Sequence, residues 1–293
     1  MKTNVITSLS LLFAITILVC HSCTMNDKLS KGHSRPSDKQ IQADLDSICA
    51  EGYKLYVADR FNWIASDSAL AHYDIEDFGA NMIWQPSDTV WSAFFTDKEV
   101  MSCVYELRYN TATDEWKSLH SKRLLSNTEQ QLLKDKSIMY RNAFSLYGDS
   151  IRYNSEYGQP NIDIVRINDH TIRMYILQGC ERPNIIPFGN DYSIDLDNNY
   201  NVTAFRRYHR SFIPIPTVVE DGTPTQNATH SHLKDNPYIT PTDICNFLLY
   251  RGSMTQTFVL STALNGIIIY NAENNKAIFL SHEVIEKIQK REH

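Results

Sequence analysis

Hydrophobic and polar positions follow a helical spacing in the first part of the chain. Across residues 41–49, apolar side chains recur every three or four positions, which predicts an amphipathic helix that Gly52 ends. The apolar segment at 53–65 could continue as a helix. Farther on, Ser126 and Glu129 fit a capping box, and the apolar residues behind them predict a long helix.

Between and after these helices the pattern alternates with a period of two, which is typical of strands with one buried face. Residues 82–84 and 90–95 flank a turn at 86–88 and predict a hairpin, and residues 101–109 predict the next strand. The second half of the chain is predicted to be mostly strands, in segments 162–167, 171–178, 192–196, 202–212, 258–261, 266–270 and 277–280.

The remaining segments are irregular or helical. Prolines predict an exposed loop over 214–224, a short helix is expected over 244–249, and residues 282–293 are predicted to be a charged helix or tail. Together these elements predict an α+β fold with mixed or antiparallel sheets and flanking helices. We expect an N-terminal α+β region at 39–150 and a β-rich C-terminal region at 151–293, built around one core or two.

Composition and charge narrow the functional class. The chain has 293 residues, of which 42% are hydrophobic and 21% charged, as in ordinary globular proteins. Its formal net charge is −6, and it has neither a basic stripe nor a glycine-rich phosphate loop. Nucleic-acid binding needs clustered Lys and Arg to displace counterions, so nucleic acid is not an expected partner.

The N-terminus predicts export. An apolar run at 5–19 has the length of a signal-peptide core and is short for a membrane span. The run ends in Cys20 and Cys23, which resembles the lipobox of bacterial lipoproteins. Ser22 is a small residue before the cut and favours Cys23 as the lipidated residue, with Cys20 as the second choice.

We therefore predict a signal peptide at 1–22 and a flexible polar tether at 23–38. The protein would be lipid-anchored in the cell envelope and would meet the membrane through its lipid. A plain secretory signal is the alternative. The remaining cysteines are far apart and are expected to be small buried hydrophobes: Cys49, Cys103, Cys180 and Cys245.

One constellation in the C-terminal half indicates chemistry. His230 and His232 are two positions apart, so on a strand both rings face one side, as two ligands of one metal must. Asp243 follows at the expected start of the next helix, from which its carboxylate can turn back toward the strand end. Two imidazoles and a carboxylate suit Zn²⁺ and leave a fourth position for a water that the metal acidifies.

The segment around Asp243 also has a purely structural explanation. Thr240, Pro241 and Asp243 supply an N-cap, a proline at the first helical position and an acid in the first turn. Asp243 therefore has a role in the helix without any metal. The alternative function is accordingly a non-catalytic binding or structural lipoprotein of the envelope, in which the histidine pair is a polar surface feature.

The spacing His230-x-His232, ten residues, Asp243 is similar to the JAMM (JAB/MPN) metalloprotease signature, with Thr240 standing where that family has Ser. The resemblance implies that residues 151–293 are JAB-like and that the histidines and Asp243 bind zinc. It also implies that Thr240 helps to hold the oxyanion and that the activity is hydrolysis of peptide or isopeptide bonds. The signature needs an upstream glutamate as general base.

Two glutamates are candidates for that base, and neither sits inside a predicted strand as the family requires. Glu181 directly follows a strand, and Glu220 lies in the proline-rich loop. Other metalloenzymes with an H-x-H pair fit less well, since metallo-β-lactamases, cupins and amidohydrolases need further ligands or strands that this chain lacks at the required positions.

The chain as a whole resembles uncharacterised envelope lipoproteins of Bacteroidetes in residues 188–192, 209–211 and 229–245. This likeness implies the same compartment and says nothing about activity. The expected partner, apart from the membrane, is a peptide or another envelope component. Within the shared segments, Asp191 and His209 are candidates for hydrogen-bonding a ligating histidine, because such a ring donates its other N–H to a carboxylate or carbonyl.

Overall fold

The computed structural model of the chain describes residues 36–120 and 122–290. The described residues from Ser37 onward form one compact unit. The predicted signal peptide, most of the tether and both candidate lipidation sites, Cys20 and Cys23, lie outside the described residues. No helix within the described ranges is long and apolar enough to cross a membrane.

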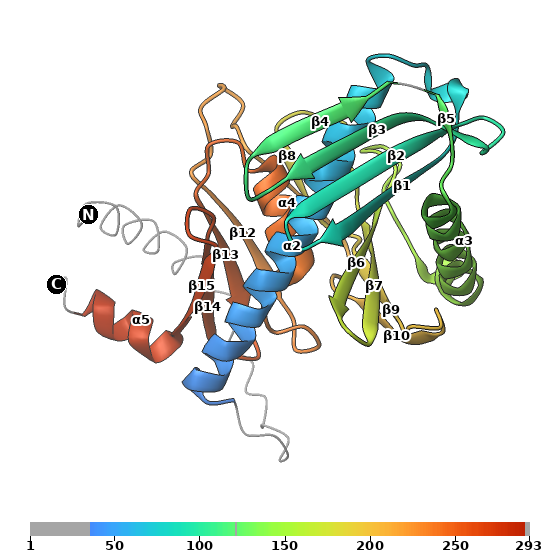
Figure 1. Cartoon of the computed structure of the whole chain (residues 1–293). Coiled ribbons are helices and arrows are strands. Elements are labelled where there is room, and N and C mark those ends of the chain that lie inside the picture. The colour runs from blue at the N-terminus through green and yellow to red at the C-terminus, as the bar shows by residue number, and fades with distance from the viewer. Residues whose placement is uncertain (1–35, 121, 291–293) are drawn as a thin grey trace. The chain divides into compact units, whose positions relative to one another are not determined.

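A single long helix, α2 (Asp38–Leu70), links the layers of the unit (Figure 1). Ser37 caps it by accepting a hydrogen bond from the Gln40 amide. The helix contacts α4, β15, β6 and β2. Its buried side chains consequently belong to two different hydrophobic cores.

Gly52 does not end this helix, so that prediction is wrong. The residue is buried where α2 crosses α4, and a Cβ atom there would lie 2.7 Å from Ile244 Cβ and 3.1 Å from the Pro241 carbonyl oxygen. Glycine is present because the two helices approach too closely for any side chain. The apolar segment at 53–65 continues the helix, as the pattern allowed.

The first sheet has five strands, ordered β1-β2-β3-β4, with the short β5 also pairing with β3. Every pairing in it is antiparallel, and the predicted hairpin is formed by β1 and β2, where Ser87 pairs with Val90. A 3-10 turn, Ile75–Asp77, leads into the sheet. The strands are β1 (Phe78–Ser87), β2 (Val90–Asp97), β3 (Ser102–Asn110), β4 (Glu115–Leu119) and β5 (Arg123–Leu124).

The second sheet has four antiparallel strands in the order β10-β9-β7-β6, and α3 packs against it. The predicted capping box between Ser126 and Glu129 is present at the start of α3. Met139 and Ala143 from this helix join the apolar face of the sheet. The elements are α3 (Asn127–Tyr147), a 3-10 turn (Gly148–Ser150), β6 (Asn161–Asn168), β7 (Thr171–Leu177), β9 (Tyr192–Leu196) and β10 (Val202–Arg207).

A two-stranded ribbon of β8 (Ile185–Gly189) and β11 (Phe212–Pro216) replaces part of the predicted proline-rich loop. Pro214 pairs with Pro187 in this antiparallel ribbon. Each strand of a two-stranded ribbon has one edge that pairs with no other strand. A proline whose missing N–H would point to that edge removes no hydrogen bond, so prolines are tolerated there. Proline alone therefore predicted a loop where the chain forms a strand.

The last sheet carries the C-terminal strands in the order β12-β13-β14-β15. β12 runs parallel to β13, and α4 forms the connection between these two strands, whereas the other pairs are antiparallel. Its core joins this sheet to α2 and α4. The elements are β12 (Asn227–His232), α4 (Pro241–Tyr250), β13 (Gln256–Ser261), β14 (Gly266–Asn271), β15 (Lys276–Ser281) and α5 (His282–Gln289).

The predicted α+β class with antiparallel and mixed sheets is confirmed. Cys49, Cys103 and Cys245 are buried free thiols, as expected, whereas Cys180 is partly exposed. Both predicted C-terminal helices are present, because α4 covers the segment 244–249 and α5 begins at His282.

Candidate metal centre

Strand β12 presents its two histidines to the interior. Burial alternates along the strand, so Ala228, His230 and His232 are buried while Ser231 between them is exposed. The strand pairs with β13, where His230 lies opposite Val259 and His232 opposite Ser261. The prediction that both rings share one face of a strand is confirmed.

Helix α4 begins at the predicted place and delivers the carboxylate. Thr240 is the N-cap, Pro241 follows it, and Thr240 and Asp243 form a reciprocal capping box. Asp243 Oδ2 accepts hydrogen bonds from the Thr240 amide and hydroxyl, each at 2.8 Å. Asp243 Oδ1 is buried and has no hydrogen-bond partner. One carboxylate oxygen thus serves the helix, and the other is left for a cation.

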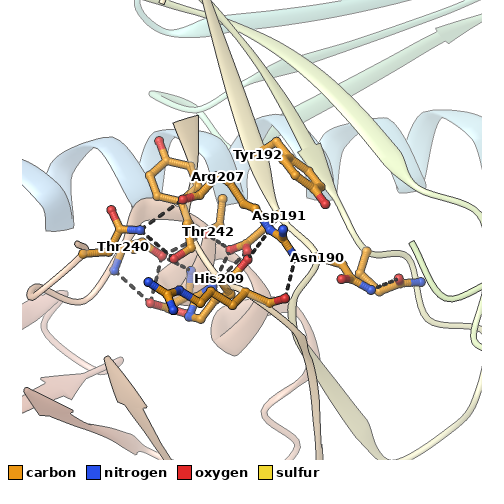
Figure 2. A network of polar contacts seen from close by, with 12 residues as sticks. Asn190, Asp191, Tyr192, Arg207, His209, Thr240 and Thr242 are labelled. Atoms are coloured by element: carbon orange, nitrogen blue, oxygen red, sulfur yellow. Dashed lines mark hydrogen bonds and ion pairs between the residues drawn. The ribbon is translucent and has the colours of Figure 1, made fainter. Parts of the chain in front are cut away.

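His209, in the loop after β10, is the third imidazole at this place (Figure 2). Its Nε2 lies 2.9 Å from His232 Nε2 and 3.3 Å from Asp243 Oδ1. His230 Nε2 lies 3.0 Å from His232 Nε2 and also 3.3 Å from Asp243 Oδ1. The three rings and the carboxylate therefore converge on one point.

The His209 loop lies against the end of β8, the strand that comes just before Asp191 in the chain. Gly189 has φ of 81°, and a Cβ atom there would lie 2.0 Å from the Ser211 carbonyl oxygen, so only glycine fits. Asn190 follows with φ of 51°, and this turn directs Asp191 toward His209. His209 Nδ1 lies 2.8 and 3.0 Å from the two Asp191 carboxylate oxygens.

The hydrogen bonds on the far side of each ring define which nitrogens face the centre. Asp191 accepts from His209 Nδ1, and the Asn236 carbonyl oxygen, 3.1 Å from His232 Nδ1, can only accept. In their neutral forms both rings therefore carry the proton on Nδ1 and a lone pair on Nε2. Two lone pairs 2.9 Å apart repel each other, so either a proton or a metal ion lies between them.

The spacing of the donor atoms matches a tetrahedral metal ion. Bonds of about 2.0–2.1 Å in a tetrahedral arrangement separate neighbouring ligand atoms by roughly 3.3 Å. His209 and His230 each place Nε2 at 3.3 Å from Asp243 Oδ1, and His232 Nε2 lies 3.3 Å from Asp243 Oδ2. All four ligand atoms lie within 4.8 Å of one another, and all four residues are buried.

The electrostatics of the centre also call for a cation. Asp191 and Asp243 are fully buried, and their only ion-pair partners among the described residues are these histidines. Burial raises the pKa of Asp243, but the three histidines outweigh it and hold the pKa well below its usual range. Two buried carboxylates beside three neutral imidazoles carry two negative charges, which one divalent ion neutralises.

The pKa values of the rings follow from the same surroundings. Burial lowers the pKa of His209, but the carboxylates of Asp191 and Asp243 outweigh burial and raise it to about 9. Burial lowers the pKa of His230. Without a metal, His209 would hold a proton at neutral pH, and metal binding would have to displace that proton.

Supporting contacts surround the four donors. The Thr242 hydroxyl donates to Asp191, which fixes the carboxylate that holds His209 (Figure 2). The Asn236 side chain donates to the carbonyl oxygens of Arg207 and Tyr208, at 3.0 and 2.8 Å, and so ties its loop to the end of β10. The Phe188 ring packs against His230 with centroids 4.6 Å apart. His230 Nδ1 has no hydrogen-bond partner among the described residues.

Of the site residues predicted from the sequence, some lie at the centre and others lie away from it. His230, His232 and Asp243 are brought together, and Thr240 holds Asp243 through its backbone and hydroxyl groups. Glu181 and Glu220 are exposed, and neither belongs to the group of ligand atoms at the centre. Asp191 binds a histidine ring, as was anticipated for it.

Sequence reasoning assigned His209 a supporting role and missed it as a donor to the centre itself. No local spacing marks it, because twenty residues separate it from His230, and neither the ribbon partner β11 nor the tight Gly189 turn was predicted. The predicted strand at 202–212 placed His209 inside a strand, whereas β10 ends at Arg207 and β11 begins at Phe212. The available signal was its place in the shared segment 209–211.

A second group of potential ligand atoms consists of Cys103, Glu106 and Glu129. Here the Arg123 guanidinium already donates to both glutamates, at 2.7 and 2.8 Å. Burial raises the pKa of the Cys103 thiol to about 11, so it is protonated at neutral pH. This group is an ion-pair network that supports the fold.

Comparison with known proteins gave no relative from which a role could be transferred. No protein family, curated protein or solved structure matched the chain. Three histidines and one aspartate form a buried group that could hold a metal ion. The support for this assignment comes from the geometry of this chain alone.

Proposed function

We propose that the protein binds one zinc ion through His209, His230, His232 and Asp243. The observation that supports this most strongly is the convergence of three imidazole Nε2 atoms and the buried Asp243 Oδ1 on one point, with two of the rings fixed from behind by Asp191 and the Asn236 carbonyl oxygen. His209 Nε2 and His232 Nε2 lie 2.9 Å apart, so a metal ion would take the place of the proton that His209 holds there. Asp243 Oδ1 makes no hydrogen bond and lies 3.3 Å from the Nε2 atoms of His209 and His230.

The donor set favours zinc over harder ions. Imidazole nitrogens suit zinc and other late first-row metals, whereas Mg²⁺ and Ca²⁺ prefer oxygen ligands. Four protein donors at tetrahedral spacing are typical of closed zinc sites, which stabilise a fold. Here the ion would connect a loop, a strand and a helix, because its ligands come from the segment after β10, from β12 and from α4. The proposed role is thus a zinc-stabilised binding or structural protein.

Metal content tests this proposal. The full chain, loaded with zinc and freed of excess by gel filtration, should carry close to one zinc per molecule by mass spectrometry of the metal. His232→Ala and Asp243→Asn should lose it. His170→Ala is the matched control, because His170 is an exposed histidine on the β6–β7 turn, and this variant should retain the metal. Folded wild-type protein that retains no zinc would refute the site.

Peptide or isopeptide hydrolysis, implied by the resemblance to JAMM metalloproteases, is a second candidate. A cavity of about 500 Å³ adjoins the centre, and its wall includes His209 and His232. Catalysis would require His209 to leave the metal so that water takes its place, since a hydrolytic zinc keeps an open position. It would also require a base other than Glu181 or Glu220, unless one of these exposed side chains moves.

Activity assays separate the two candidates. Under the hydrolase function, zinc-loaded protein cleaves peptide or isopeptide substrates, and His232→Ala abolishes the cleavage. His209→Ala, which opens a coordination position, should then retain activity. If neither wild-type protein nor His209→Ala cleaves any substrate while zinc stays bound, the closed-site role stands alone.

Lipid anchoring in the cell envelope remains part of the proposal, supported by the N-terminal sequence. Cys23 is the proposed lipidated residue and Cys20 the alternative. Mass spectrometry of the membrane-extracted protein should find a diacylglyceryl cysteine at the new N-terminus. Cys23→Ser should release the chain from membranes, and an unchanged membrane fraction would transfer the assignment to Cys20.

A further inference from the structure

A second candidate site lies in a cleft between α2 and the five-stranded sheet. Its volume is about 690 Å³, within the range of small-ligand pockets. One face of α2, from Ala50 to Ile64, forms one wall, and residues from β1 to β4 and their turns form the other. The metal centre contributes none of the residues that line it.

The cleft is rich in aromatic rings that remain accessible. Trp116 on β4 stacks on Tyr109 of β3, with centroids 4.2 Å apart and ring planes at 17°. Trp116 is nevertheless 41% exposed, and Tyr53 on the helix side is 46% exposed. Trp116 also stacks on Phe61 of α2, with centroids 5.9 Å apart. Large aromatic side chains are usually buried, so the exposed parts of Trp116 and Tyr53 offer apolar surface to a ligand within one cleft.

Polar groups alternate with these rings, and their charges cancel. Lys54 and Arg60 on the helix contribute two positive charges, and Asp88 and Asp114 on the hairpin turns contribute two negative charges. Arg60 donates to the Tyr56 hydroxyl at 3.1 Å. Asp114 accepts from the Tyr109 hydroxyl at the same distance, 3.1 Å. Balanced charge favours an uncharged ligand over a nucleotide or an acidic peptide.

We propose that this cleft binds a neutral oligosaccharide. A sugar ring offers an apolar C–H face that packs on Trp116 or Tyr53 and a rim of hydroxyls that both donate and accept. The carboxylates of Asp88 and Asp114 can only accept, so they match hydroxyl donors. Arg60 and Lys54 can only donate, so they match the sugar oxygens.

A proline-rich peptide is the rival occupant, because aromatic grooves also bind polyproline helices. Such a peptide has carbonyl acceptors but no N–H at its prolines, so it would offer no donor to Asp88 and none to Asp114 beyond the Tyr109 hydroxyl already there. The two acceptor-only groups at the cleft therefore favour the sugar.

Titration of the full chain with defined probes tests the proposal. The probes are neutral tri- to hexasaccharides of glucose, mannose, galactose and N-acetylglucosamine, with decaproline as the rival, followed by calorimetry and tryptophan fluorescence. At least one oligosaccharide should bind saturably with one site per chain. Trp116→Ala should weaken that binding about tenfold or more, and Trp116→Tyr, which keeps an aromatic face, should recover most of it.

Trp84→Ala is the matched control, because Trp84 packs with Phe94 in the separate core that includes Leu132 of α3. Circular dichroism confirms folding of each variant. The proposal is overturned if no oligosaccharide in the panel binds, if decaproline alone binds, or if folded Trp116→Ala binds as tightly as the wild type. Because zinc binding is measured separately, either proposal can fail without the other.

Discussion

At the scale of single residues, Asp191 has the largest influence on the centre without being one of its four donors. It fixes the ring and the tautomer of His209 through both carboxylate oxygens, and Thr242 fixes Asp191 in turn. His209 is the only donor that comes from a loop, so it depends most on a partner behind it. Such outer partners affect metal affinity nearly as strongly as the ligands themselves.

Asp191→Asn should therefore weaken zinc binding by about 10–100-fold, because the amide no longer carries the charge that makes His209 a better ligand. Competition against a chromogenic zinc chelator measures the affinity. Asp235→Asn is the control, since Asp235 forms an exposed ion pair with Arg210 and should leave the affinity unchanged. Equal affinities for all three proteins would show that Asp191 does not support the site.

At the scale of elements, the crossing of α2 and α4 positions the carboxylate. Gly52 of α2 lies against Ile244 and the Pro241 carbonyl oxygen, within the first turn of the helix that carries Asp243. The sequence predicted both helices, and it predicted the start of α4 from its Thr N-cap, its proline at the first helical position and the acid in its first turn. It mistook Gly52 for a stop because a glycine needed for close packing looks the same in sequence as one that ends a helix.

Gly52→Ala should lower the free energy of unfolding by about 1–3 kcal/mol, since the added methyl group has no space between the helices. Displacement of α4 should also lower the zinc affinity. Gly148→Ala is the matched control: its Cβ would meet Phe144 at an ordinary 3.8 Å, and its φ of −52° suits alanine. Urea unfolding measures the stability of both variants. If Gly52→Ala is as stable as Gly148→Ala, the two helices do not require glycine at their crossing.

The N-terminus of α3 shows how an element's cap can carry an ionic interaction. Burial raises the pKa of Glu129, but hydrogen bonds from Arg123 and Ser126 outweigh burial and lower the pKa from 4.5 to about 2. A depressed carboxyl pKa gives stability that is present above the unfolded value and is lost as pH falls through the folded value. Glu129 therefore contributes to the loss of stability between pH 4.5 and about 2.

Glu129→Gln should be less stable at neutral pH and should lose less stability on acidification. Between pH 4.5 and about 2, the free energy of unfolding of Glu129→Gln should change less steeply with pH than that of the wild type. The difference in slope corresponds to at most one proton taken up on unfolding. Urea unfolding at a series of pH values gives the slope, with Glu99→Gln, an exposed substitution, as the control. Identical slopes for wild type and Glu129→Gln would contradict the assignment.

At the scale of the whole molecule, the sequence predicts local structure better than it predicts which segments meet. The periods of two and 3.6 predicted the α+β class and most strands, and the capping box of α3 and the N-cap and proline of α4 predicted the starts of these helices. They did not give the β8–β11 ribbon, because its pairing is long-range and its prolines indicate a loop. That ribbon and the Gly189 turn bring His209 to the centre, so the sequence pattern did not predict His209 as the fourth donor.

The fourth donor also changes the proposed function of the whole protein. Three ligands predicted from the sequence leave a position for a catalytic water, whereas four ligands close the coordination sphere. We therefore propose that the folded chain holds a tetrahedral zinc site with three imidazoles and one carboxylate.

X-ray absorption at the zinc edge tests that claim most directly. For the zinc-loaded full chain, the spectrum should show four nitrogen or oxygen neighbours at about 2.0–2.1 Å from the zinc. It should also show the scattering from the more distant ring atoms of three imidazoles. His209→Ala should reduce the imidazole count by one. Six oxygen neighbours, or a spectrum that is the same in wild type and His209→Ala, would contradict the account.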